Sequence, residues 1–353
     1  MAYTTIDDPE LYFKCVVYTA TTAEAYTDNS FSFQPDFIWL KNRDTTYPHH
    51  LFDSVRGADK GLSTNSEDEE QDRGSGYLTS FDSDGFSTGT SIASDTSDGV
   101  VAWCWKAGTS FSNDASATSI GDIDSTGSIS TAAGISIMSY TGNGTANQSV
   151  AHGLGVVPKF IIIKNRSTSG YWPCTNPRFV SVSDPNVMYL QFNEAEADDT
   201  NINGTTAPSS TVFGIDDYGA VNTSGDAHIA YCFAEIKGYS KFSTYTGNGD
   251  ADDGPFVYLG FRPAWVLIKR ADSAGSFEIY DAKREGFNPQ VHGLYTNSTS
   301  AEDNTDDLLD LLSNGFKLYH DGAGLNADGG TYIYMAFAES PFVNSKGVPN
   351  KAR

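Results

Sequence analysis

Runs of apolar residues that open with a proline and end in basic or amide residues recur along this chain. Each run places four or five apolar residues in succession and then turns polar, which is typical of a strand that is buried and then reaches the surface. Proline at the start of such a strand is tolerated because its missing N–H costs little there. The three runs are PDFIWLKNR from Pro35, PKFIIIKNR from Pro158 and PAWVLIKRA from Pro263.

Other segments also have the pattern of strands. Tyr12–Thr19 and Phe242–Gly247 alternate apolar and polar positions, and three further runs are rich in Trp, Tyr, Phe, Val and Ile: VAWCWKA, IAYCFAE and IYMAFAE. Aromatic and β-branched residues favour strands. Clusters of Gly, Asp, Asn, Ser and Thr separate these segments and indicate turns. The pattern therefore predicts an all-β fold of the sandwich or barrel kind.

One segment, Asn304–Phe316, is predicted to be helical instead. Asp306, Asp307 and Asp310 lie near its start, four leucines cluster within it, and Gly315 fits a helix C-cap.

The spacing of these segments predicts an internal repeat. The motif YTGNG begins at Tyr140 and again at Tyr245, and a proline-led run follows each copy after eighteen residues. In the first third of the chain, YTATT begins at Tyr18, seventeen residues before Pro35. An arginine, an L-x-x-N motif and a closing aromatic then follow in the same order in each copy: Arg56, Arg178 and Arg284; Asn65, Asn193 and Asn297; Trp105, Phe233 and Phe337.

Landmarks that recur in one order at near-constant spacing are the signature of a repeat architecture. We predict three tandem, diverged β-sandwich repeats, jelly-roll or lectin-like, at residues 1–112, 113–238 and 239–343, with a C-terminal tail at 344–353. The proline-led runs should then occupy the same strand position in each repeat.

The YTGNG motif is glycine-rich, but it does not match a phosphate-binding loop. A P-loop needs a Lys-Ser/Thr pair and a following helix, and the dinucleotide fingerprint needs a third glycine. Here TANQS and DADDG follow, which are further turn residues. We therefore interpret YTGNG as a tight turn that needs a positive φ at Asn or Gly.

Composition and charge exclude several classes of function. The net charge is −23 and the sequence pI is near 4.4, whereas a nucleic-acid-binding surface must be basic. No apolar run approaches the length of a membrane span, and the N-terminus lacks the basic and apolar regions of a signal peptide. We expect neither nucleic-acid binding nor membrane insertion.

The four cysteines are predicted to be free thiols. Cys104 and Cys232 occupy the same place in two copies, and Ala336 fills it in the third. A position that accepts Cys, Cys and Ala is a small buried site rather than half of a disulfide. Cys15 lies in an alternating strand, and Cys174 stands alone in WPCTNP, so we expect a chain made in a reducing cytosol.

Several long motifs resemble a family of tailed-bacteriophage virion proteins. The resemblance spans nearly the whole chain and rests on PDFIWLKNRD, LFDSVRGADKGLSTN, SYTGNGTANQSVAHGLGVVPKFIIIKNRS and STYTGNGDADDGPFVYLGFRPAWVLIKRAD. That family consists of structural or tail-fibre-like modules, many of them from marine phages. The resemblance implies a location on the virion, synthesis in the host bacterial cytoplasm and multi-copy assembly with other virion proteins. The family offers no catalytic residues to carry over, and we expect no enzyme and no cofactor.

The candidate sites from residue patterns each have a structural alternative. Asp53/Arg56 and Asp281/Arg284 share an Asp-x-x-Arg spacing, while Thr175 stands opposite Arg178 in the second copy, which favours a structural ion pair over catalysis. In NGDADDG, Asn248, Asp250 and Asp252 place oxygen ligands at alternate positions, but Asp253 and Leu259 replace the glycine and glutamate of an EF-hand loop. A looser calcium site is the alternative to a plain turn.

Tyr171 and Trp172 are candidates for stacking against a glycan, or they belong to the core.

A carboxylate-rich loop follows each L-x-x-N motif. The loops are SEDEEQD at 66–72, EAEADD at 194–199 and AEDNTDD at 301–307. One interpretation is a solvated loop that blunts a sheet edge, and the other is a set of equivalent loops on one face that holds cations or repels wrong neighbours.

Two classes of function fit these observations. The first is a tail fibre or receptor-binding protein that contacts a glycan or another receptor on the host surface, and the second is a capsid decoration or a neck or tail adaptor with a structural role. We expect a homo-oligomer, a trimer by analogy with tail fibres, because an aromatic content of 13% leaves rings for contacts between chains. Three tandem units within one chain could instead supply the threefold character of a monomer.

Overall fold

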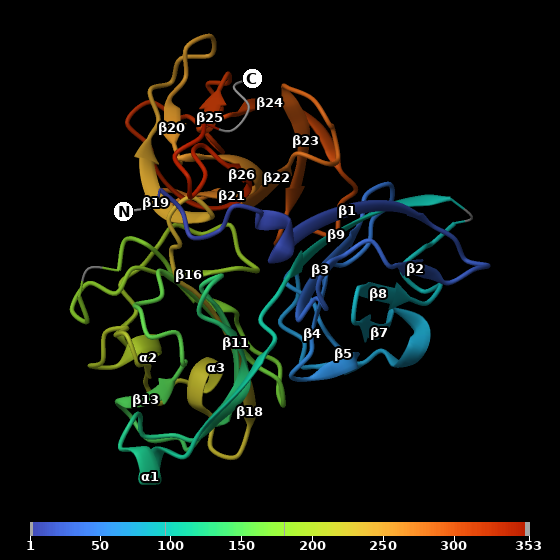
Figure 1. Cartoon of the computed structure of the whole chain (residues 1–353). Coiled ribbons are helices and arrows are strands. Elements are labelled where there is room, and N and C mark those ends of the chain that lie inside the picture. Colours follow the sequence, from blue (N-terminus) through green and yellow to red (C-terminus); the bar gives the residue numbers. More distant parts are fainter. Residues whose placement is uncertain (1–2, 96, 180, 350–353) are drawn as a thin grey trace.

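The computed structural model of this protein is nearly all β and forms three lobes around a common centre (Figure 1). It describes residues 3–95, 97–179 and 181–349, with the backbone alone at 303–308. Lobe 1 contains η1 (Pro9–Leu11), β1 (Phe13–Ala20), β2 (Tyr26–Asp28), β3 (Phe37–Asn42), β4 (His50–Asp53), β5 (Gly57–Leu62), β6 (Gln71–Asp72), η2 (Gly74–Gly76), β7 (Leu78–Asp82), β8 (Gly85–Thr88) and β9 (Asp98–Trp105).

The other two lobes follow in chain order. Lobe 2 contains β10 (Thr109–Asn113), α1 (Ala115–Thr118), β11 (Ser125–Ser130), β12 (Ile135–Thr141), β13 (Gln148–Ala151), β14 (Phe160–Asn165), β15 (Pro173–Thr175), β16 (Val187–Tyr189), α2 (Thr200–Asn203), β17 (Val212–Ile215), α3 (Gly219–Asn222) and β18 (Ala227–Phe233). Lobe 3 contains β19 (Ser240–Thr246), β20 (Phe256–Tyr258), β21 (Phe261–Arg270), β22 (Phe277–Asp281), β23 (Gln290–Tyr295), β24 (Asp303–Leu312), β25 (Gly315–Leu318) and β26 (Thr331–Pro341). No helix of the described part is long and apolar enough to cross a membrane.

The three lobes share one strand order at their centres. The closing strand of each lobe lies between its lead-in strand and its proline-led strand, giving β1-β9-β3-β4, β12-β18-β14-β15 and β19-β26-β21-β22, all antiparallel. The proline-led runs thus occupy the same position in each sheet. The shared strand order does not itself test whether the lobes arose by duplication of one unit, which stays a prediction. The predicted boundary at residue 112 lies inside β10, which pairs with β11, so lobe 2 as described here begins with β10.

Each central sheet has two buried faces, which explains why its strands are continuously apolar. The outer faces contribute to separate cores, one within each lobe, where Cys104, Cys232 and Ala336 are fully buried. The inner faces meet in one core at the centre of the molecule. There the rings of Trp105, Phe233 and Phe337 contact one another, with centroids 5.6 to 6.5 Å apart. The small position predicted from the cysteines is therefore a core site, and all four cysteines are buried and free.

The helix predicted at Asn304–Phe316 is wrong. Asp303–Leu312 forms β24, which pairs with β23 and β25. Leu309 and Leu311 are fully buried on the same side of the strand, so the leucines follow a period of two. Gly315 begins β25 instead of capping a helix, and a Cβ there would lie 2.1 Å from the carbonyl oxygen of Val257. The side chains of Asp306 and Asp307 lie outside the described residues.

The proline-led strands begin as predicted in two lobes but not in the third. β14 and β3 start two residues after Pro158 and Pro35, whereas Pro263 lies inside β21. The register between β21 and β26 shifts on both sides of Pro263. A proline is tolerated in a strand at such a bulge because the ladder is already interrupted there.

Candidate functional site

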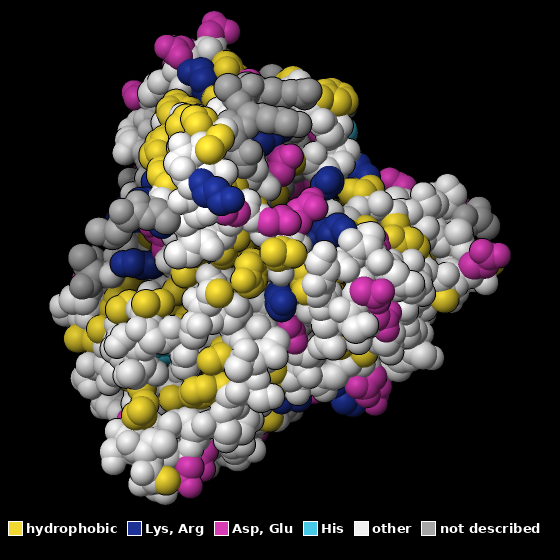
Figure 2. Space-filling model, in the orientation of Figure 1, with side chains coloured by type: hydrophobic (Ala, Val, Ile, Leu, Met, Phe, Trp, Pro, Cys, Tyr) yellow, Lys and Arg dark blue, Asp and Glu magenta, His cyan; other side chains and the backbone are white. Residues whose placement is uncertain are grey.

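The acidic loops join the lobes. In each lobe, one backbone amide of the loop donates to the carbonyl oxygen at the end of the neighbouring lobe's proline-led strand. The bonds run from Glu70 to Arg166 at 3.0 Å, from Glu196 to Ala271 at 2.9 Å and from Glu302 to Arg43 at 2.7 Å. On the face in Figure 2, Asp and Glu side chains are scattered rather than gathered in one patch. The loops therefore act as contacts between lobes, a role that neither interpretation of their sequences included.

A buried lysine supports each of these contacts. Lys41, Lys164 and Lys269 are fully buried, and each ammonium donates to a backbone carbonyl in the neighbouring acidic loop or just before it: Thr299 at 3.3 Å, Glu67 at 3.3 Å and Glu194 at 2.7 Å. Burial disfavours the charged amine and lowers the pKa of each lysine to about 8.

The Asp-x-x-Arg pairs lie at the same junctions and form buried networks. Arg56 Nε lies 2.5 Å from Asp53 Oδ2, and its Nη1 lies 3.1 Å from Glu70. Glu70 in turn pairs with Arg166 of lobe 2 at 2.9 Å. Tyr231 of lobe 2 also donates its hydroxyl to Asp53 at 2.7 Å. This chain of charges connects lobe 1 to lobe 2.

An equivalent network connects lobe 3 to lobe 1. Arg284 Nε lies 2.6 Å from Asp281 Oδ2, and Glu302 pairs with both Arg284 and Arg43. The indole of Trp103 donates to Asp281 at 3.0 Å, as Tyr231 does to Asp53. Burial alone would raise the pKa of Asp281, but the charge and hydrogen bonds of Arg284 outweigh burial and lower it.

The third junction lacks both ends of the network. Continuing the register of β14 and β15 by one step places Asn176, rather than Thr175, at the position of Asp53 and Asp281. Ala271 stands in place of the arginine of the neighbouring lobe, so among the described residues of this junction the Arg178–Glu196 pair alone remains, with the Arg178 side chain 35% exposed. These pairs are arranged as structural ion pairs, which agrees with the interpretation favoured from sequence.

The two glycan candidates separate in the structure. Trp172 is fully buried in the central core and donates its indole N–H to Ser66, so its ring is not accessible to a ligand. Tyr171 is half-buried at the surface of lobe 2, where its ring contacts Tyr189 and Phe192, with centroids 5.4 and 5.1 Å away.

A carboxylate and a further tyrosine complete this cluster. Tyr189 donates its hydroxyl to Asp199 at 2.7 Å. Burial raises the pKa of half-buried Tyr218, and the nearby Tyr171 and Asp199 raise it further. We call Tyr171, Tyr189, Phe192, Tyr218 and Asp199 the aromatic cluster. Sequence reasoning identified only Tyr171, because the others lie 18 to 47 residues further along the chain.

The calcium candidates Asn248, Asp250 and Asp252 lie in one turn, where the protein itself uses side-chain oxygens of the first two. Asp250 Oδ1 accepts the backbone amides of Asp252 and Asp253, and Asn248 Oδ1 accepts that of Asp250. The buried amide of Asn326 holds the same loop through Asn248. The side-chain oxygens of Asn248 and Asp250 therefore cap the turn. Calcium binding here stays a prediction.

Both YTGNG motifs are turns of one design. Gly144 and Gly249 have φ values of 68° and 64°, as expected for a tight turn. Asn222 and Asn326, both fully buried, accept the amides of Asn143 and Asn248 at 2.8 Å. The motif is thus structural, as its sequence context predicts.

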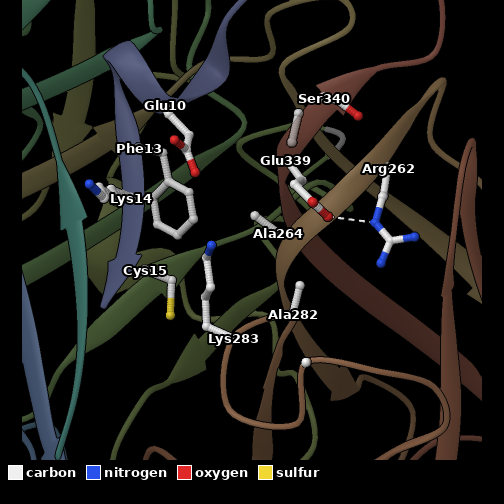
Figure 3. Close-up of a pocket in the computed structure, with 12 residues that line it drawn as sticks. Glu10, Phe13, Lys14, Cys15, Arg262, Ala264, Ala282, Lys283, Glu339 and Ser340 are labelled. Carbon is white, nitrogen blue, oxygen red and sulfur yellow. Dashed lines mark hydrogen bonds and ion pairs between the residues drawn. The ribbon is translucent and has the colours of Figure 1, made fainter. Parts of the chain in front are cut away.

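A cavity of about 440 Å³ lies where lobe 3 meets lobe 1 (Figure 3). Phe13 and three alanines supply its apolar wall, while Lys283 points toward its centre. Two other cations at its rim are already engaged, Lys14 by Ser30 and Arg262 by Glu339 at 2.5 Å.

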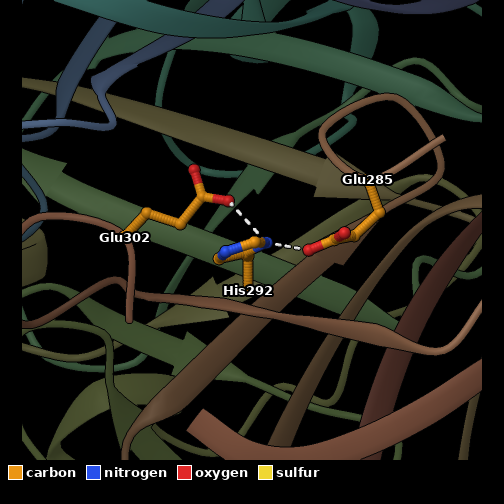
Figure 4. Close-up of side chains that lie close together, drawn as sticks. All are labelled: Glu285, His292 and Glu302. Atoms are coloured by element: carbon orange, nitrogen blue, oxygen red, sulfur yellow. Dashed lines mark ion pairs between the residues drawn. The ribbon is translucent and has the colours of Figure 1, made fainter. Parts of the chain in front are cut away.

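Three further side chains form a group that the sequence did not reveal. Glu285, His292 and Glu302 bring one potential metal-ligand atom each within 4.8 Å of one another (Figure 4). Their positions in the sequence differ by seven and by ten and match no metal-binding spacing, so only the fold brings them together.

A model of the family described as a domain of unknown function, DUF7483, matches residues 8–341. Comparison with curated proteins and with solved structures found no match.

Proposed function

We propose that this chain, which belongs to the DUF7483 family of unknown function, is a bacteriophage virion component. It binds carbohydrate on the host surface through the aromatic cluster of lobe 2. The virion location rests on the resemblance of the sequence motifs to tailed-phage proteins. The mode of action, binding rather than catalysis, rests on the cluster itself.

The single observation that carries the proposal is the half-buried set of rings beside a carboxylate. Tyr171, Tyr189 and Phe192 pack edge to face, which fixes their orientation while leaving part of each ring at the surface. The apolar C–H face of a pyranose can stack on such a ring. The Asp199 carboxylate can accept hydrogen bonds from sugar hydroxyls, and Tyr189 already orients it.

The environment favours a neutral or cationic sugar. Three exposed carboxylates surround the cluster. Glu194 and Asp198 are close in sequence to Phe192 and Asp199, and the charge of Glu67 contributes to the raised pKa of Tyr218. Like charges repel, so an anionic polysaccharide would bind less well than a neutral one.

Binding of the whole chain to host-derived surface polysaccharide tests the proposal. Replacing Tyr171 with Ala should weaken binding about 2- to 13-fold, because loss of one stacked ring removes roughly 0.5–1.5 kcal/mol. Tyr319→Ala is the matched control, since Tyr319 is also half-buried but lies in lobe 3. Equal binding by the wild type and Tyr171→Ala would refute the proposal.

A second candidate is a structural protein that attaches to other virion subunits. β20 lies at the open edge of the eight-stranded sheet, and Phe256 and Tyr258 on it are 45% and 50% exposed. An exposed edge with apolar side chains can pair with a strand of another chain. This candidate fits a capsid decoration or a neck or tail adaptor, and position in a map of the virion separates it from the first.

Trimer formation stays a prediction. All five tryptophans, Trp39, Trp103, Trp105, Trp172 and Trp265, are buried within one chain. The centre where three lobes meet therefore accounts for them without a second copy. Light scattering across a salt series measures the mass directly.

A further inference from the structure

We propose that the cavity where lobe 3 meets lobe 1 binds a small organic carboxylate, held by the ammonium of Lys283 and by an apolar wall that includes Phe13. Lobe 1 contributes β1 to this cavity, and lobe 3 contributes β21, β26 and the turn after β22. In Figure 3 the side chains of Phe13 and Lys283 point into the cavity from the two lobes. Its volume of about 440 Å³ lies within the range of small-molecule sites, roughly 300–1,000 Å³.

The same place in lobe 1 is filled by a carboxylate of the protein itself. One backbone bond identifies the matching positions in the two lobes: Ser54 donates its amide to Asp36 at 2.8 Å, and Ala282 donates to Ala264 at 2.9 Å. In lobe 1 the buried Asp36 carboxylate accepts the Ser54 hydroxyl at 2.7 Å and the amide of Ala107 at 2.9 Å. This place in the fold therefore suits a carboxylate.

Lobe 3 lacks both of these side chains and carries a cation beside the space they leave. Ala264 and Ala282 line the cavity in place of the carboxylate and the hydroxyl. Lys283 stands where lobe 1 has Val55, each two residues after the Asp of its Asp-x-x-Arg pair. Val55 packs against the central core, whereas Lys283 is exposed in the cavity. Protein interiors are close-packed and an empty space forfeits contacts, so a ligand carboxylate would restore what Asp36 supplies in lobe 1.

The charges of the cavity favour an anion. Three cations and two carboxylates line it, which leaves one net positive charge in a chain whose net charge is −23. Arg262 is paired with Glu339, so Lys14, Lys283 and Glu10 remain. Among residues 3–95, 97–179 and 181–349, the Lys283 ammonium has neither a hydrogen bond nor an ion pair. A carboxylate that reaches it would accept charge-assisted hydrogen bonds.

The apolar wall narrows the class of ligand. Phe13, Ala264, Ala282 and Ala338 offer hydrocarbon surface next to the single free cation at the centre. A monocarboxylate with a compact apolar body matches both features, whereas a second acidic group would meet the like charge of Glu10. Such a ligand contacts both lobes and should hold lobe 3 against lobe 1.

Isothermal titration calorimetry of the full chain with acetate, butyrate and benzoate tests the proposal. Affinity should rise from acetate to benzoate as the apolar body fills the wall, with one site per chain. Benzamide, the uncharged analogue of benzoate, should bind about 10-fold or more weakly, and Lys283→Met should weaken benzoate binding about 10- to 100-fold. Ala264→Asp restores the carboxylate that lobe 1 has and should abolish benzoate binding, because the protein then occupies the place itself.

Lys159→Met is the matched control, because Lys159 is an exposed lysine of lobe 2 outside the cavity and its loss should leave benzoate affinity unchanged. Far-UV circular dichroism checks that each variant folds, and the exposed Lys283 carries the test if Ala264→Asp does not fold. The proposal is overturned if none of the three carboxylates binds saturably, if benzamide binds as well as benzoate, or if Lys283→Met keeps the wild-type affinity. Tyr171→Ala should bind benzoate as the wild type does, so failure of the carbohydrate proposal leaves this one standing, and the reverse.

Discussion

The hydrogen bond from Tyr231 to Asp53 offers a direct test of how the lobes are held together. The Tyr231 hydroxyl lies 2.7 Å from Asp53 Oδ2, and both side chains are fully buried at the junction of lobes 1 and 2. The same carboxylate receives Arg56 Nε at 2.5 Å. Tyr231→Phe removes this one donor and retains the ring that packs on Phe37 at 4.6 Å.

The magnitude follows from the charge of the acceptor. A buried hydrogen bond to a charged group contributes about 1.5–3 kcal/mol, so Tyr231→Phe should lower the free energy of unfolding by that amount. Asp53→Asn should cost more, about 3–5 kcal/mol, because the buried Arg56 guanidinium loses its closest carboxylate. Since both changes act on one carboxylate, the double variant should lose less than the sum, by about 0.5–3 kcal/mol.

Denaturant unfolding followed by tryptophan fluorescence measures these values, because all five tryptophans are buried. Met335 is the matched control, since it occupies the position of Tyr231 in lobe 3 and Met335→Leu should cost less than about 1.5 kcal/mol. A loss below about 0.5 kcal/mol in Tyr231→Phe, or strict additivity in the double variant, would refute the role of this bond.

Three further outcomes are expected. The free energy of unfolding should rise between about pH 8 and 10, because Lys41, Lys164 and Lys269 lose their protons near pH 8 in the folded chain but keep them up to about pH 10.5 in the unfolded chain. Urea unfolding of the variant with all three lysines changed to Met should lack this rise. An unchanged rise in that variant would contradict the lowered lysine pKa values. Asp281→Asn should flatten the loss of stability below pH 4. The lowered pKa of Asp281 contributes stability at pH values above 3.8, its pKa in the unfolded chain, and this contribution disappears as the pH falls through the pKa of the folded chain. A variant whose stability follows the wild type across the pH series would count against this contribution. Asn326→Ala should speed amide exchange in the Asn248–Gly254 loop, and exchange at the wild-type rate would show that the buried amide does not hold it.

Local sequence pattern was enough to predict the proline-led and closing strands of each lobe and the lead-in strands of lobes 1 and 3. The proline-led runs, the closing runs and the YTGNG turns are each specified by residues that are neighbours in sequence, through apolar continuity, β-rich composition and glycine at positive φ. The Cys104, Cys232 and Ala336 equivalence also identified a core position correctly, because side-chain size limits what a buried site accepts.

Local pattern failed where a distant partner decides the structure. Leu309 and Leu311 fit a helix as well as a strand by composition, and pairing with β25 selects the strand. Tyr171 and Trp172 are adjacent, yet packing at the centre buries one and leaves the other at the surface.

The contacts between lobes were also invisible in the sequence. Asp53 and Tyr231 are 178 residues apart, as are Trp103 and Asp281, and nothing in either local pattern names the other. The acidic loops looked like solvated edges because their composition is that of surface loops, but their backbone amides and carbonyls are what the neighbouring lobes bind. The sequence alone determined which segments of each lobe's central sheet become strands. The packing of three sheets around one core decided which polar side chains are buried together. Only that packing removes these side chains from water, and a polar group removed from water is costly unless it is paired.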